Sequence, residues 1–197
     1  MAESYIEKFL NDYIDIDIDK EVTNELATKT KLQVKANVHR FNENCTPKED
    51  RIITYNITNC PGGSVSAGLA IYDDMICEKD VKVKTISSGM VASMGVIIAL
   101  GGDKGLRYAY PDTEFLLHQP LIMGSGIQQT TDVLIQARHM EKIRNKLYSI
   151  IAKETGQPLE KIASDCERDF VLTAEEALEY GLIDEIIKPR EDRKWII

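Results

Sequence analysis

Residues 89–100 have the sequence Gly89-Met90-Val91-Ala92-Ser93-Met94-Gly95-Val96-Ile97-Ile98-Ala99-Leu100, and the rest of the chain is organised around them. This pattern predicts the end of a strand that turns at Ser93 into a short apolar helix. A hydroxyl at such a turn lies beside backbone N–H groups that no earlier helical turn satisfies, and these donors favour negative charge. A serine in a turn of small residues is usually a helix cap, however, so a catalytic role for Ser93 requires partners elsewhere in the chain.

Length and composition indicate an ordinary globular protein. The chain has 197 residues, of which 43% are hydrophobic and 28% charged, and we expect a single domain over residues 1–197. The net charge of −8 argues against a nucleic-acid-binding surface. Residues 1–4 do not resemble the start of a signal peptide, and no apolar run is long enough to cross a bilayer. We therefore expect a cytoplasmic protein that does not contact a membrane.

The cysteines and glycines do not form a metal or nucleotide motif. The four cysteines are scattered without a C-x-x-C pair, which predicts reduced thiols and neither a disulfide framework nor a zinc site. There is no G-x-x-x-x-G-K-[ST] sequence, so the chain should not hydrolyse ATP itself. We expect no cofactor and no bound metal.

The first third of the chain alternates helix and strand signals. Apolar residues at helical spacing predict a helix over residues 4–13, and the Ile/Asp alternation of residues 14–19 predicts a half-buried strand. Residues 20–38 indicate a helix with four partly buried members, Val22, Leu26, Leu32 and Val34. Residues 41–50 are rich in Asn, Pro and Lys and predict a loop.

A strand over residues 51–58 ends at Pro61-Gly62-Gly63, which breaks it and allows a backbone path that few residues can take. Main-chain N–H groups are thereby brought close to whatever lies opposite. A helix over residues 65–77 follows, and a strand over residues 81–86 leads to the Ser93 turn. Repeated strand and helix signals of this kind imply a layered α/β fold.

After the turn, Gly101-Gly102 ends the apolar helix, and residues 106–110 and 114–118 predict two strands. A single apolar stripe predicts one long helix over residues 128–153, which need not lie wholly on its own domain. A shorter helix reaches about Asp165. The capping box at residues 173–176 opens a helix that stops at Gly181, and residues 182–187 form a last strand.

Ser93, His118 at a strand end, and an aspartate after a helix could act as nucleophile, base and orienting acid. Taken alone, a histidine at a strand end is more often a structural hydrogen-bonding residue than a catalyst. The α/β-hydrolase elbow is excluded, because it requires G-x-S-x-G and the order serine, acid, histidine. Here the serine follows Val91-Ala92, and the plausible acid follows the histidine.

From about Ile52 to Ile187 the chain resembles the family of Clp protease proteolytic subunits (ClpP). Four blocks in order carry the resemblance, and together they are far more specific than any one alone: Pro61-Gly62-Gly63-Ser64-Val65 with residues 67–73, Ala92-Ser93-Met94-Gly95, His118-Gln119-Pro120-Leu121, and Glu167-Arg168-Asp169 with residues 174–177. The resemblance implies a spiral α/β fold of repeated ββα units, as in the crotonases, with a protruding long-helix handle at about residues 121–155.

The family pattern makes Ser93 the nucleophile, His118 its general base and then acid, and Asp169 the residue that orients the imidazole. Asp165 and Glu167 match less well, since the family's aspartate follows the arginine. The oxyanion hole would be the backbone N–H groups of Gly63 and Met94. An extended peptide would bind between two segments, represented by Ser64 and Val65 on one side and by Pro120 and Leu121 on the other.

The resemblance also implies the assembly. Family members form homo-oligomers of two stacked heptameric rings that enclose a chamber, in which unfolded proteins delivered by an AAA+ unfoldase are cleaved. Glu167 and Arg168 would lie at the contact between rings. The early first helix and the polar Thr54, Asn56 and Thr58 differ from the usual pattern and leave open a divergent paralogue that works with a second, paralogous ring.

Three other functions are compatible with parts of the pattern. The chain could be a non-catalytic ring subunit, which the presence of all three catalytic residues disfavours. It could be an enoyl-CoA hydratase or isomerase that uses the Gly63 and Met94 N–H groups, although such enzymes normally place carboxylates beside them. A Ser-Lys peptidase is weaker, because His118 would then have no role.

Overall fold

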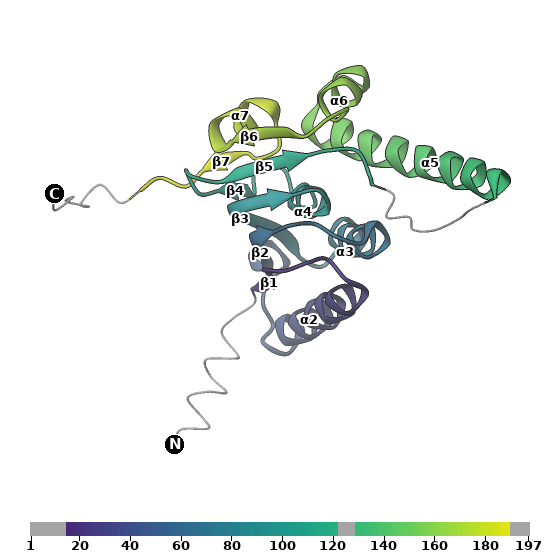
Figure 1. Cartoon of the computed structure of the whole chain (residues 1–197). Helices are drawn as coiled ribbons and strands as arrows, with labels where there is room; N and C mark the ends of the chain where they lie inside the picture. The colour runs from purple at the N-terminus through teal and green to yellow at the C-terminus, as the bar shows by residue number, and fades with distance from the viewer. Residues whose placement is uncertain (1–14, 122–128, 190–197) are drawn as a thin grey trace.

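The structure is a computed structural model that describes residues 15–121 and 129–189. The helix expected over residues 4–13 therefore lies outside the described residues. Seven strands form one sheet, with helices packed against it and one long helix that projects to the side (Figure 1). The expectation of an α/β fold with a protruding long helix is confirmed.

The strands are β1 (Ile16–Ile18), β2 (Ile52–Cys60), β3 (Lys82–Ala92), β4 (Arg107–Ala109), β5 (Glu114–Leu117), β6 (Phe170–Thr173) and β7 (Glu185–Ile186). Five follow the order β1-β2-β3-β4-β7, while β5 pairs with β3 and β6 with β5. All pairings are parallel except that of β5 with β6. The long strand β3 pairs with β4 through residues 85–87 and with β5 through residues 90–92, so its end leads into a smaller sheet region.

The helices are α2 (Asn24–Glu43), α3 (Val65–Cys77), α4 (Met94–Ala99), α5 (Thr130–Thr155), α6 (Leu159–Asp165) and α7 (Ala174–Tyr180), with a 3₁₀ turn η1 (Lys48–Asp50). The helix expected over residues 65–77 is confirmed as α3. The capping box is confirmed too, since Thr173 and Glu176 each accept from the other's backbone N–H before α7, which ends at Gly181 with φ 88°. Strand β6 was not predicted.

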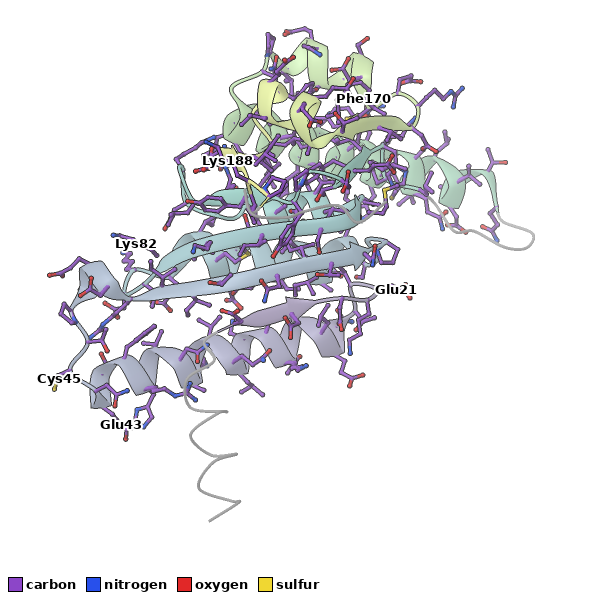
Figure 2. The ribbon with its side chains drawn as sticks, turned by 90° about the vertical axis from the view of Figure 1, so that its left-hand side faces the viewer. Glu21, Glu43, Cys45, Lys82, Phe170 and Lys188 are labelled. Carbon is purple, nitrogen blue, oxygen red and sulfur yellow. The ribbon has the colours of Figure 1, made fainter. Side chains whose placement is uncertain are left out.

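Helix α2 differs from the sequence prediction at both ends. It begins four residues later and runs on to Glu43, which shortens the loop expected over residues 41–50. Val22 precedes the helix and forms a bridge with Gly63. The prediction that Leu32 is partly buried is wrong, because it is 61% exposed and the stripe facing the core is Leu26, Thr30, Val34, Asn37 and Phe41. Figure 2 shows α2 running beside β1 and β2, from near Glu21 to Glu43 and Cys45.

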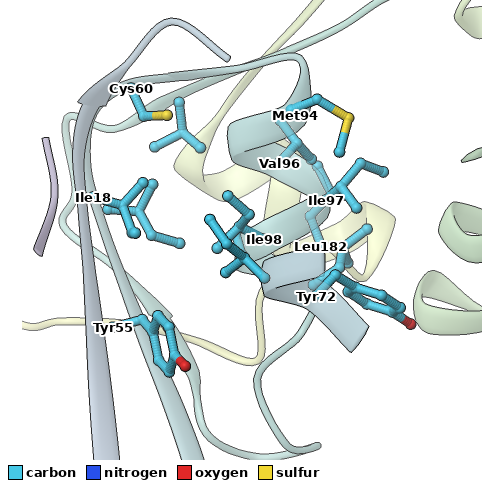
Figure 3. Packing of buried hydrophobic residues seen from close by; sticks show 14 of the residues in the cluster. Ile18, Tyr55, Cys60, Tyr72, Met94, Val96, Ile97, Ile98 and Leu182 are labelled. Carbon is cyan, nitrogen blue, oxygen red and sulfur yellow. The ribbon is translucent and has the colours of Figure 1, made fainter. Parts of the chain in front are cut away.

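The core centres on α4, all of whose residues are buried. A short helix that is apolar all round can be stable only when other elements surround it. Met94, Val96, Ile97 and Ile98 face buried residues of the strands and of α3, with Leu182 beside them (Figure 3). Each fully buried side chain of this size contributes roughly 1.5–3 kcal/mol. The Ser93 turn is therefore anchored at its helical end by the densest part of the core.

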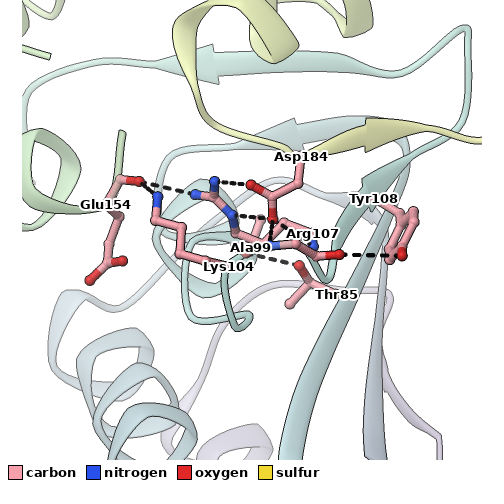
Figure 4. A network of polar contacts seen from close by, with 8 residues as sticks. Thr85, Ala99, Lys104, Arg107, Tyr108, Glu154 and Asp184 are labelled. Carbon is pink, nitrogen blue, oxygen red and sulfur yellow. Dashed lines mark hydrogen bonds and ion pairs between the residues drawn. The ribbon is translucent and has the colours of Figure 1, made fainter. Parts of the chain in front are cut away.

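A buried ion pair joins β4 to the segment before β7. Both Arg107 Nη2 and Arg107 Nε donate to the Asp184 carboxylate, which also accepts from the backbone N–H groups of Gly105 (2.8 Å) and Arg107 (3.0 Å). Arg107 Nη1 and Lys104 Nζ donate to the Glu154 carbonyl near the end of α5 (Figure 4). Arg107 thus connects the sheet to the base of the long helix.

Candidate active site

Ser93 lies between the last residue of β3 and the first residue of α4. Its φ of 55° lies in a region that residues other than glycine rarely adopt. This backbone conformation costs on the order of 1–3 kcal/mol of folding free energy. Its side chain makes no capping hydrogen bond to α4, so the cap interpretation of this serine is not met. The Ser93 N–H donates to the Leu116 carbonyl at 2.8 Å, which fixes the turn against β5. Among the described residues, no side-chain hydrogen bond engages the half-buried Ser93 hydroxyl.

The Pro61-Gly62-Gly63 segment packs directly on this turn. A Cβ added to Gly62 would lie 2.6 Å from Ser93 Cβ and 3.0 Å from Met94 N, so only glycine fits. The segment is held by Val22, whose N–H donates to the Gly62 carbonyl (2.7 Å) and whose carbonyl accepts from Ser64 N–H (2.8 Å). Within the described residues, the N–H groups of Gly63 and Met94 donate to no protein acceptor. Two backbone donors are therefore available beside Ser93.

His118 directly follows β5, and residues 90–92 of β3 pair with residues 114–116 of β5. The two strands therefore end at the same edge of the sheet, and Ser93 and His118 line one pocket. The other lining residues are almost all apolar: Val65, Met94, Val96, Ile97, Leu117, Pro120, Leu147, Tyr148 and Ile151. The structure thus brings together the predicted nucleophile, the predicted base and an apolar cavity.

Asp169 directly precedes β6, and the pairing of β6 with β5 places it near His118. Strands β5 and β6 are antiparallel with Leu117 opposite Phe170, so continuing the register places His118 opposite Asp169. Asp169 itself is exposed and is not among the pocket residues. In the described part of the chain, no side-chain hydrogen bond connects Ser93, His118 and Asp169 with one another. The structure therefore puts the three residues at one edge without joining them.

The segments expected to bind a peptide flank the same pocket. Val65 and Pro120 line it, whereas Leu121 is 70% exposed. Ser64 caps α3 through its side chain, which accepts from Ala67 N–H at 3.4 Å. Two of the four residues therefore line the pocket, Ser64 caps α3, and Leu121 is exposed to solvent.

The cysteines near the site are poor candidates for a nucleophile. Cys60 and Cys166 are buried, and burial raises the pKa of both thiols, that of Cys166 to about 11. A thiol with such a pKa stays protonated at neutral pH and is unreactive. Among the described residues there is also no group of three or more His, Cys, Asp or Glu side chains suited to hold a metal ion.

Sequence reasoning missed the wall that α5 contributes to the pocket. Leu147, Tyr148 and Ile151 are the buried residues of this otherwise largely exposed helix. These three residues follow helical spacing (i, i+1 and i+4). The sequence pattern could therefore have distinguished them from the charged residues in the rest of the helix. The contacts of Gln119 with the turn before Asp169 also had no signal in the sequence.

A serine on a strained strand-to-helix turn, two free N–H donors and a histidine in the same pocket form the arrangement of a serine hydrolase. Residues 4–190 match the family model described as Clp protease. The chain is 52% identical to the ATP-dependent Clp protease proteolytic subunit of Streptococcus thermophilus over 133 residues, which is 68% of this chain and 67% of that protein. Proteins with the same description from Streptococcus salivarius and Streptococcus pneumoniae are 51% and 50% identical over the same shares. The chain belongs to the Clp protease family and is a serine peptidase.

No helix in the described residues combines the length and apolarity needed to span a bilayer.

Proposed function

We propose that Ser93 attacks the peptide carbonyl, that His118 accepts its proton and then protonates the leaving amine, and that Asp169 orients the imidazole. The observation that carries this proposal is the shared pocket of Ser93 and His118, with a Ser93 hydroxyl that no capping bond engages. Asp169 is exposed and makes no hydrogen bond to His118 among the described residues. We propose that a neighbouring subunit covers this edge in the assembly and completes the alignment of the three residues.

The N–H groups of Gly63 and Met94 are proposed to form the oxyanion hole. Both are free of protein acceptors in the described residues, and Gly62, which precedes Gly63, packs against the Ser93 turn. Negative charge develops on the carbonyl oxygen only in the tetrahedral intermediate, so donors fixed in advance stabilise the transition state more than the substrate. The loss of one such donor typically costs ~10²–10³ in turnover.

The peptide is proposed to bind in extended form between Ser64-Val65 and Pro120-Leu121. Main-chain hydrogen bonds would supply affinity with little dependence on sequence. The apolar wall of the pocket beside Ser93 favours an apolar side chain next to the scissile bond, because a charged one would lose its hydration there.

The active form is proposed to be a homo-oligomer of two stacked heptameric rings, with cleavage inside the enclosed chamber. The relatives are described as subunits of an ATP-dependent Clp protease, and this chain carries no P-loop of its own. An AAA+ unfoldase is therefore the proposed partner that delivers unfolded protein, and a paralogous ring remains a second candidate partner. Glu167 and Arg168 are both exposed, as a contact between rings would require.

The test compares wild type with Ser93→Ala on a small fluorogenic peptide, with and without candidate unfoldases and ATP. Wild type should cleave the peptide, and the variant should lose on the order of 10⁶ in kcat. Equal activity of the two proteins would overturn the assignment of Ser93. Peptide cleavage without degradation of a folded substrate by any unfoldase would contradict the proposed partner and favour the paralogous ring.

A further inference from the structure

The turn of residues 166–168 carries Asp169 and is held from one side by Gln119, the residue after His118. The Gln119 N–H donates to the Cys166 carbonyl at 3.0 Å, and Gln119 Nε2 donates to the Glu167 carbonyl at 3.1 Å. One residue therefore binds two successive carbonyls of the turn through both its backbone and its side chain. Any shift of the turn relative to His118 has to break these bonds.

Tyr180, the last residue of α7, contacts the residues on either side of the same turn. Its hydroxyl donates to Asp165 Oδ2 at 2.7 Å, and its ring packs on Phe170 with centroids 5.7 Å apart. Asp165 precedes the turn and Phe170 follows Asp169, so Tyr180 contacts both ends of the segment. Lys161 adds a bond to the same Asp165 oxygen (2.5 Å) and lies 4.6 Å from the centre of the Tyr180 ring.

Asp169 depends on these contacts, because its own side chain makes no hydrogen bond to another described residue. Its position opposite His118 follows only from the backbone that carries it. Catalytic groups must be held to within about 0.5 Å of their working geometry, usually by hydrogen bonds from residues behind them. A displacement of 1 Å can cost ~10²-fold in rate.

We propose that Gln119 and Tyr180 are positioning residues that hold Asp169 opposite His118. The inference rests on the proposed roles of His118 and Asp169. Gln119 fixes the turn to the strand end that bears the histidine, and Tyr180 fixes it to α6 and α7. Neither side chain lines the Ser93 pocket, so both act through Asp169 and not through substrate.

The test measures kcat and KM for a fluorogenic peptide in Gln119→Met and Tyr180→Phe, each in the wild-type and the Asp169→Ala background. Gln119→Met keeps the chain length and removes the amide, and Tyr180→Phe removes only the hydroxyl. Each should lower kcat by about tenfold with little change in KM, since a misplacement smaller than 1 Å is expected. In the Asp169→Ala background both effects should vanish. Tyr108→Phe, which removes an exposed hydroxyl bonded to the Gly105 carbonyl, is the control and should match wild type.

Two further measurements separate positioning from general stability. A role limited to positioning should also leave the thermal unfolding midpoint of each variant close to that of wild type. Asp165→Asn keeps an acceptor for the Tyr180 hydroxyl and should therefore retain more activity than Asp165→Leu. Sedimentation velocity should show the same assembly for both variants.

Unchanged kcat in Gln119→Met and Tyr180→Phe, with a large loss in Asp169→Ala alone, would overturn this inference and leave the proposed function intact. Equal losses in both backgrounds would also overturn it, because the two residues would then act on the fold and not through Asp169. Wild-type activity in Asp169→Ala alone would overturn the role of Asp169 itself.

Discussion

At the scale of single residues, the site depends on close backbone approach at Gly62. Its φ is 87°, and an added Cβ would lie 2.6 Å from Ser93 Cβ and 2.9 Å from the Ala92 carbonyl. The two atoms belong to the turn that holds the nucleophile. A side chain at this position must therefore displace either the turn or the Gly62-Gly63 segment with its proposed oxyanion donor.

Gly62→Ala should abolish most peptide cleavage and destabilise the protein, whereas Gly105→Ala should affect stability only. Gly105 has nearly the same φ, 85°, but its Cβ would meet nothing within 4 Å. Both substitutions carry the left-handed penalty of ~1–2 kcal/mol, and only Gly62→Ala adds the clash at Ser93. Steady-state cleavage and urea unfolding of both variants measure the difference. Equal activity in the two would show that the Gly62 contact does not shape the site.

The sequence could predict an unusual backbone path at this site but not the conformation of Ser93. Pro61-Gly62-Gly63 indicated an unusual backbone path, and the structure has positive φ at both glycines. The positive φ of Ser93 had no signal, because serine is uncommon in that conformation and the strain is imposed by tertiary contacts. Whether the Ser93 hydroxyl would cap α4 or stay unbonded could be decided only from the structure.

At the scale of elements, the pair of Arg107 on β4 and Asp184 before β7 is a largely buried polar link. The two side chains are 3% and 19% exposed. Burial disfavours the charged carboxylate, but the hydrogen bonds and charge of Arg107 outweigh it and lower the pKa of Asp184. Because the pair is largely buried and fully bonded, removing one member leaves the other charge uncompensated.

Asp184→Asn should lower the free energy of unfolding by about 3 kcal/mol at pH 7, the low end for a broken buried pair. The folded pKa lies below the unfolded value, so this contribution is present above the unfolded pKa of ~3.9 and is lost as the pH falls through the folded pKa. The difference in unfolding free energy between wild type and variant should therefore narrow below about pH 4. Urea unfolding of both proteins from pH 7 down to pH 3 measures this difference.

Asp80→Asn provides the matched control. Asp80 also has a lowered pKa, through its hydrogen bond with Lys48, but its side chain is 43% exposed and that of Lys48 is 70% exposed. Water screens such a pair, so its loss should leave the unfolding midpoint nearly unchanged. The structural role of the buried pair would be contradicted if the stability lost in Asp184→Asn did not change with pH. It would also be contradicted if that loss were no larger than the loss in Asp80→Asn.

Most elements could be predicted from the sequence because their hydrophobic period is clear. The alternation in β2 is the best case, with Ile53, Tyr55 and Ile57 buried. Strand β6 has four residues, only one of which is buried, and it pairs at an edge, so no period marks it. That missed strand sets Asp169 opposite His118, and the relation of the two residues therefore required the structure.

At the scale of the whole molecule, the first half of α5 lacks packing partners in the described protomer. Residues 130–139 are all exposed, among them Val133 (47%), Leu134 (54%) and Ile135 (59%). Three large apolar side chains in succession are unusual on a monomer surface, and we expect them to contact another chain. The base of the same helix lines the Ser93 pocket through Leu147, Tyr148 and Ile151. A contact made by the tip is therefore connected through one rigid helix to the site.

Leu134→Glu and Ile135→Glu should each shift the protein to a smaller assembly without unfolding the protomer. We expect this face of α5 to lie in a contact between subunits, where an added charge would lose its hydration, whereas in the free protomer the charge stays in water. Peptide cleavage should fall with the assembly, because the exposed edge at Asp169 then loses the neighbour that covers it. Sedimentation velocity gives the mass, and thermal unfolding the integrity of the protomer.

Gln136→Glu adds the same charge at an exposed polar position on the same segment and should keep both mass and activity near wild type. This control separates the loss of apolar contact from a general effect of charge on the acidic chain. If Leu134→Glu retains the wild-type mass, the tip of α5 is not the contact. If it dissociates but cleaves peptide at the wild-type rate, the protomer holds Ser93, His118 and Asp169 in working order by itself, and the assembly serves only to enclose the substrate.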